Sequence, residues 1–172
     1  MLGRLLVGAA VAWPLVAGGA LWQRTASDTP VWAAIVYAVA GQVCHQRPER
    51  SFHTHDVAWP VCARCAGLYL AAPFAAVFAL RRRSSSATRS SDEVRSSGEV
   101  RSSGWFSSPR NSPLRLVILA AIPTMLTVLW EWGGLGTPSN VWRFASALPL
   151  GAVVAFVLVS IAIEPEPSGP IG

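Results

Sequence analysis

The chain has 172 residues, of which 52% are hydrophobic and only 13% are charged, against a charged share of about 25% in soluble domains. This composition excludes an ordinary soluble globular protein and predicts one all-α, polytopic integral membrane domain over residues 1–172. The arginine-rich segment 81–115 accounts for the whole formal net charge of +5. Such a concentration between apolar segments favours retention on the cytoplasmic side over binding of nucleic acid.

Five apolar segments are predicted as transmembrane helices, with four as the alternative: residues 2–22, 30–44, 58–80, 114–132 and 141–163. A helix needs ~20 apolar residues to cross the hydrocarbon core. The first segment could instead be a signal peptide, with Arg4 preceding its apolar run and small residues 18–20 as a cleavage site. The second has a short apolar run, Val31–Val43, which is about 20 Å long as a helix. We therefore expect Cys44 to lie at the membrane surface.

The third segment carries two helical faces. Cys62, Cys65 and Tyr69 share one of them. Small residues recur every four positions on the other: Ala63, Gly67, Ala71, Ala75 and Ala79. This ridge predicts close approach by another helix, within the chain or in a partner protein. A transporter or accessory subunit without catalysis is therefore one functional hypothesis.

The segment 81–113 is predicted to be a disordered, basic, cytoplasmic loop, because its Ser/Arg/Gly composition buries no apolar area. Strict alternation across five spans then puts residues 44–57 and 133–140 outside, residues 23–30 inside and the N-terminus outside. The expected location is the cell (inner or cytoplasmic) membrane, as a multi-pass protein. Polar residues of the outer segments should gather at one level, where ionisable groups are costly and often functional.

The outer segment 44–57 and the start of the third predicted helix together contain every cysteine and histidine of the chain. Three thiolates and one imidazole suit tetrahedral zinc, so the predicted metal ligands are Cys44, His45, Cys62 and Cys65. Either His53 or His55 could replace His45. A Cys-x-x-Cys pair at a helix N-terminus also fits a thiol-disulfide oxidoreductase, with Cys44 as the resolving thiol. Inert packing of the cysteines is the third interpretation, and the sequence leaves all three open.

The charged residues of this level have two interpretations each. Arg47 and Arg50 could contact lipid phosphates or bind an anionic, lipid-like substrate. Glu131 could be merely interfacial or could pair with Arg143 or Arg64. If the site is catalytic, the candidate residues are Arg50, Glu131 and Arg143, beside a metal with one position open to water.

The motif CHQ-x-x-x-RSF followed by PVCARC-x-G-x-Y resembles a family of small multi-pass prokaryotic membrane proteins, domain of unknown function 2085. Residues 44–52 and 60–69 carry it here. A second half is similar in Pro123, Asn140-x-x-Arg143 and Gly151. The chain differs from the family pattern in Thr127-Val128, Glu131 and Ala147, where that pattern has Asp-Gly, Gln and Gly. The resemblance implies a polytopic membrane protein with a Cys/His site, and no established activity.

Overall fold

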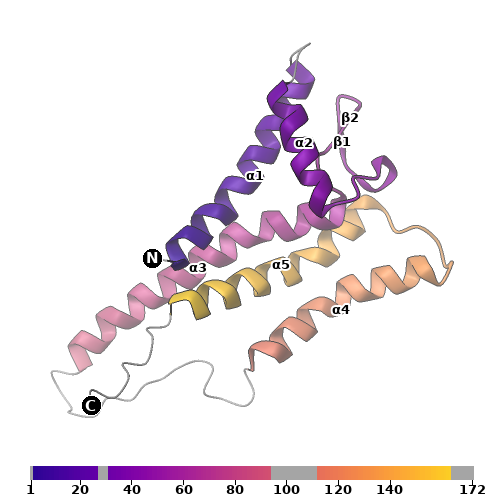
Figure 1. Cartoon of the computed structure of the whole chain (residues 1–172). Coiled ribbons are helices and arrows are strands. Elements are labelled where there is room, and N and C mark those ends of the chain that lie inside the picture. Colours follow the sequence, from indigo (N-terminus) through magenta and orange to yellow (C-terminus); the bar gives the residue numbers. More distant parts are fainter. Residues whose placement is uncertain (1, 27–30, 94–111, 164–172) are drawn as a thin grey trace, which may run out of the picture.

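The computed structural model describes residues 2–26, 31–93 and 112–163, which form an all-α protein (Figure 1). Its helices are α1 (Leu2–Ala26), α2 (Val31–Val43), α3 (Ala63–Glu93), α4 (Pro113–Trp132) and α5 (Asn140–Ile163). A 3-10 turn, Pro48–Arg50, and an antiparallel pair of two-residue strands, β1 (His53–Thr54) and β2 (Val57–Ala58), connect α2 to α3. Within these ranges α1, α3, α4 and α5 are long and apolar enough to cross a membrane, whereas α2 is shorter. The predicted fold class is confirmed.

Helices α3 and α5 run parallel, side by side, as the centre of the molecule (Figure 1). A Cβ added to Gly67 would collide with the carbonyl oxygen of Phe144 and would lie 3.1 Å from Cβ of Ala147. One added to Gly151 would lie 2.7 Å from Cα of Leu68. The small-residue face of α3 therefore packs against α5 of the same chain. This close approach sets the distance between the first turns of the two helices.

Helix α4 runs antiparallel to α5 and covers its other side. The Thr124 hydroxyl of α4 donates to the carbonyl oxygen of Ser146 in α5 (2.8 Å). The outward faces carry large apolar side chains, such as Phe74 at 78% exposure and Leu126 at 61%. Surfaces of this kind are stable against lipid hydrocarbon and not against water, so the bundle is an integral membrane protein.

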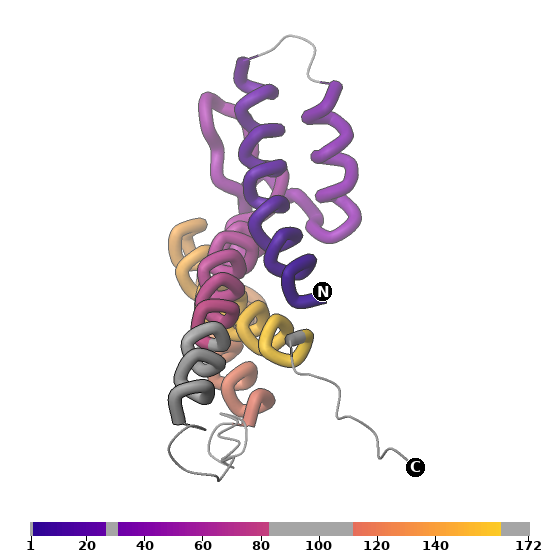
Figure 2. Tube along the Cα trace, turned by 90° about the vertical axis from the view of Figure 1, so that its left-hand side faces the viewer, coloured from indigo at the N-terminus to yellow at the C-terminus, as the bar shows by residue number. Residues whose placement is uncertain are grey.

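Helix α1 joins the bundle with its first half only. Leu6 and Ala10 pack against the cluster of Ala76, Ala79 and Val159, near the middle of α3 and the end of α5. Further along α1, Trp13 packs edge-to-face on Tyr69, with ring centroids 5.9 Å apart. The second half pairs with α2, where Ala20 contacts Ala33 and Val36. Figure 2 shows this α1–α2 hairpin rising beyond the end of the bundle.

These contacts correct the predicted topology. The start of α1 lies toward the Arg81 and Arg82 end of the bundle, and not toward the end that carries the cysteines. Strict alternation failed because it counted α2 as a span, although 13 residues reach only about 20 Å against a core of about 30 Å. The segment without a full span is thus the second and not the first. In the corrected arrangement Arg4 and Arg24 exchange ends of the bundle. The predicted difference in arginine number between the two ends is therefore unchanged.

The boundaries differ at one place that matters. Helix α3 continues to Glu93, whereas we expected a disordered loop from residue 81. No Gly or Pro interrupts residues 74–93, so the helix continues past the three arginines through a Ser-rich stretch whose own helix propensity is only intermediate. The remainder of the predicted loop, residues 94–111, lies outside the described residues.

Candidate metal centre

Three thiols meet where α2 ends and α3 begins. The sulfur atoms of Cys44, Cys62 and Cys65 all lie within 4.8 Å of one another. Cys44 is the last residue held by the hydrogen bonding of α2, since its N–H donates to the carbonyl oxygen of Ala40 (2.9 Å). Cys62 precedes the first turn of α3, and Cys65 follows within that turn. All three are free cysteines, so two segments 18 residues apart deliver three soft ligand atoms to one point.

Backbone hydrogen bonds and one glutamine hold these segments together. The backbone N–H of Cys62 donates to Sγ of Cys44 (3.2 Å). The side-chain amide of Gln46 donates to the carbonyl oxygens of Tyr37 (2.7 Å) and Pro60 (2.8 Å). Gln46 has a left-handed backbone (φ 46°), which turns the chain sharply after Cys44. Gln46 thus ties the turn after His45 to α2, at Tyr37, and to the segment before α3, at Pro60.

Cys62 does not behave as an ordinary half-buried cysteine. A hydrogen bond from the Cys65 side chain lowers the pKa of Cys62 to about 5, against the opposing effect of burial. Backbone donors of Cys65 and Arg64 and the Cys44 side chain act in the same direction. Thiolate is the form that binds metals and attacks disulfides. Cys62 is therefore prepared for either reaction at neutral pH.

The predicted histidine ligands are placed differently from the thiols. His45 is exposed and lines the same cavity as the three cysteines, but it is not part of the group of ligand atoms within 4.8 Å. His53 and His55 are exposed on the β1–β2 hairpin, whose turn has left-handed His55 and Asp56, and they do not line this cavity. Among the predicted imidazoles, His45 is the one placed to complete the site.

A second cluster lies beside the thiols and centres on Glu131 at the end of α4. Its carboxylate contacts Arg50 (2.7 Å), Arg64 (3.1 Å) and Arg143 (3.1 Å). Its side chain is 10% exposed and that of Arg143 is 5% exposed. Glu131 thus pairs with both arginines that the sequence offered, and with a third. We call these four residues the Glu131 cluster.

The Glu131 cluster also fixes the loop that carries Arg50. Asn140 accepts a hydrogen bond from Arg143 (3.0 Å) and donates one to the carbonyl oxygen of Ser51 (2.9 Å). Ser51 is fully buried, and its hydroxyl donates to the carbonyl oxygen of Arg47. Sequence reasoning assigned no role to Ser51 or Gln46, although both belong to the motif quoted above. Their presence in that motif was the one available signal.

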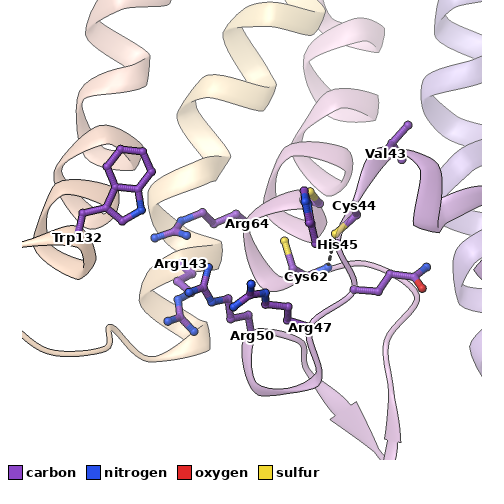
Figure 3. A pocket seen from close by; sticks show the side chains of 11 residues that line it. Val43, Cys44, His45, Arg47, Arg50, Cys62, Arg64, Trp132 and Arg143 are labelled. Carbon is purple, nitrogen blue, oxygen red and sulfur yellow. Dashed lines mark hydrogen bonds between the residues drawn. The ribbon is translucent and has the colours of Figure 1, made fainter. Parts of the chain in front are cut away.

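The three thiols and the three arginines of the Glu131 cluster line one cavity of about 410 Å³. Figure 3 shows Arg47, Arg50, Arg64 and Arg143 gathered on one side of Cys62, with Trp132 beyond them and Cys44 on the other side. The wall of the cavity is therefore thiol-rich on one side and cationic on the other. A second hollow of about 360 Å³ adjoins Arg50, Glu131 and Arg143 from the side of the 133–139 loop.

Two buried donors of this wall have no hydrogen-bond partner within the described part of the chain. They are the Nε–H groups of Arg64 and Arg143. A buried donor without a partner costs free energy, and more so when it is charged. These two arginines are thus incompletely satisfied by the described residues.

Fold and site together define a polytopic α-helical membrane protein with a cysteine- and arginine-lined cavity at one end of its bundle. The chain belongs to the DUF2085 family, described as "Predicted membrane protein", which matches residues 44–157. That match begins at Cys44 and leaves out the α1–α2 hairpin. An uncharacterized protein of Methanothermobacter thermautotrophicus is 29% identical over 115 residues, which are 66% of this chain and 81% of the relative. No solved structure matches.

Proposed function

We propose that the protein binds a thiophilic metal ion, zinc in the first instance, through Cys44, Cys62 and Cys65, with His45 as the fourth ligand. The single observation that carries this proposal is the grouping of three thiols within 4.8 Å. In tetrahedral zinc with Zn–S bonds of about 2.3 Å, the sulfur atoms are about 3.8 Å apart. A small inward movement of the thiols therefore completes three of the four ligand positions.

The proposed location is the extracytoplasmic face of the cell membrane, in a multi-pass protein. The site lies at the end of the bundle opposite Arg81 and Arg82, and arginine-rich segments are retained in the cytoplasm. If His45 leaves the fourth position to water, the ion would lower the pKa of that water and the protein would be a membrane-embedded metalloenzyme. Arg50, Glu131 and Arg143 would then bind or orient an anionic, lipid-like substrate.

Metal analysis of the full-length protein in neutral detergent tests the proposal. After zinc loading and dialysis we expect about one zinc per chain, and a loss of at least tenfold in retained zinc for Cys62→Ser. His53→Ala is the matched control, because His53 is an exposed histidine outside the cavity, and it should retain zinc. A parent protein without stoichiometric metal, or a Cys62→Ser variant that retains it, would contradict the proposal.

A second candidate function is thiol-disulfide exchange, which the lowered pKa of Cys62 favours. It requires a disulfide between Cys62 and Cys65 or Cys44 that forms and is reduced in turn. Thiol trapping in intact cells, under oxidising and then reducing conditions, separates this function from metal binding. A cycling disulfide would support it, and cysteines that remain reduced under both conditions would exclude it.

The hypothesis of a transporter or accessory subunit has less support. It was motivated by the small-residue ridge of α3, and that ridge is packed against α5 of the same chain at Gly67 and Ala79. The remaining test is extraction in mild detergent, in which a stable complex with another membrane protein would support such a role.

A further inference from the structure

The cavity carries more positive charge than the described residues neutralise. Arg50, Arg64 and Arg143 share the single carboxylate of Glu131. Arg47 also lines the cavity, and its pairing with Glu49 is long (3.9 Å) and exposed. An exposed pair of this kind contributes little. The cationic wall is therefore available to an anion from outside the chain.

Burial makes this excess charge informative. The Arg143 side chain is 5% exposed and that of Arg64 is 18% exposed, yet both share one carboxylate with Arg50. An arginine at a free surface would be satisfied by water at no cost. Buried cationic groups are retained when a paired anion offsets their desolvation. The buried part of the wall thus points to a ligand and not merely to surface charge.

Glu131 shows how an anion is held here. One of its oxygens accepts from both Arg50 and Arg143, at 2.7 and 3.1 Å, and the other accepts from Arg64. Each guanidinium group contributes one nitrogen, so three arginines together surround the two oxyanion atoms with charged N–H donors, which carboxylates and phosphates both accept. Arg47 adds a fourth positive charge to the cavity wall, and Glu131 together with the Cys62 thiolate balances two of the four. The group that best matches the remainder is therefore a dianion with several oxygens.

We propose that the cavity binds a phosphate group, either from a phospholipid headgroup or as a free phosphate, against Arg47, Arg64 and Arg143. A volume of about 410 Å³ is within the range of small-molecule sites, about 300–1,000 Å³. The inference deepens the proposed function and rests on it only in placing the phosphate beside the metal. The arginines carry the phosphate itself, so the two proposals can fail separately.

Binding by the full-length protein in neutral detergent and chloride buffer provides the test. One arm titrates inorganic phosphate by calorimetry, and the other titrates dihexanoyl phosphatidic acid, with dihexanoylglycerol as the ligand that lacks phosphate. The decisive variant is Arg47→Gln, because it leaves every contact of Glu131 in place. Arg64→Gln removes a buried donor as well. Arg115→Gln is the matched control, since Arg115 lies on α4 at the end away from Glu131.

We expect saturable binding of at least one phosphate probe, none of dihexanoylglycerol, and affinity reduced about tenfold in Arg47→Gln and unchanged in Arg115→Gln. Binding of phosphatidic acid alone identifies a lipid headgroup as the source, and equal binding of inorganic phosphate identifies the free ion. The inference is overturned if neither probe saturates, or if Arg47→Gln binds as the parent does.

Zinc content measured on the same samples keeps the two proposals apart. A zinc-free Cys62→Ser protein that still binds phosphate leaves the phosphate site standing without a metal. A zinc-loaded parent protein that binds no phosphate overturns this inference alone.

Discussion

The two sides of the cavity are built in opposite ways. The thiol side is short-range, because Cys62 and Cys65 share one turn of α3 and only Cys44 comes from elsewhere. The arginine side joins α3, α4, α5 and the 47–51 loop through Glu131. The combined charge of three thiolates would need an added cation to balance it, whereas Glu131 already neutralises part of the arginine charge. We therefore expect the arginine side to stabilise the fold and the thiol side to carry the chemistry.

The largest expected effect follows from removing the central carboxylate. Glu131→Gln leaves three arginines without their anion, and breaking a buried ion pair in this way costs about 3–5 kcal/mol. Thermal unfolding in detergent, followed by Trp fluorescence, should show a large drop in Tm. Glu49→Gln is the control, since its side chain is 64% exposed, and it should leave Tm unchanged. Equal melting of both variants would refute a stabilising role for the Glu131 cluster.

A somewhat smaller effect is expected from disturbing the contact between α3 and α5, which supports both sides of the cavity. Gly67→Ala forces a Cβ into the Phe144 carbonyl, and overpacking of this kind costs about 1–3 kcal/mol. Because α3 and α5 would separate, zinc retention and phosphate binding should fall together. Gly8→Ala in α1, where nothing lies within 4 Å, serves as the control. Loss of one activity without the other would show that the two sides do not depend on a common helix pair.

The two hydrogen bonds of the Gln46 amide, on the thiol side, should contribute less to stability. Gln46→Asn keeps a residue that tolerates the left-handed backbone but shortens the amide that reaches Tyr37 and Pro60. Two lost hydrogen bonds correspond to about 1–2 kcal/mol, and loss of such outer support lowers metal affinity about tenfold. Competition with a zinc chelator measures the second effect. Gln42→Asn, on an exposed position of α2, is the comparison, and identical zinc affinities would remove Gln46 from the site.

The smallest expected effect concerns the alkylation rate of Cys62, which should hardly change with pH. In metal-free protein the pKa of Cys62 is about 5, so this thiol stays ionised as pH falls from 8 to 6. Its alkylation by iodoacetamide should then change less than about twofold, while an ordinary thiol with pKa about 8.5 loses most of its thiolate over that range. Peptide mapping by mass spectrometry assigns the label. A rate at Cys62 that falls with pH as an ordinary thiol does would show that its neighbours do not stabilise the thiolate.

Sequence patterns predicted the features that depend on spacing along one helix. The shared face of Cys62, Cys65 and Tyr69 is present, since all three pack against one buried cluster that includes Cys44. The ridge containing Gly67 also packs as a helix contact. Both follow from the 3.6-residue period, which local sequence determines.

Features that depend on how helices associate were harder to predict. Alternation gave the wrong side for the N-terminus, because hydropathy cannot tell a span from a short helix such as α2 that pairs with α1 beyond the bundle. The partners of Glu131 could be named only as candidates, since Arg50 reaches it through a loop that Ser51 and Asn140 tie down. Such long-range contacts leave no periodic trace in a single sequence.

The position of Glu131 and Arg143 has a consequence for biogenesis. They contact each other across the short connection between α4 and α5, so this hairpin brings its own counter-charge when it enters the bilayer. Isolated ionised side chains at that depth would oppose insertion. Arg64 has no such companion within α3, and it meets Glu131 only when α3 docks beside the completed hairpin. We therefore expect the paired helices to be inserted together and the cavity to be closed last.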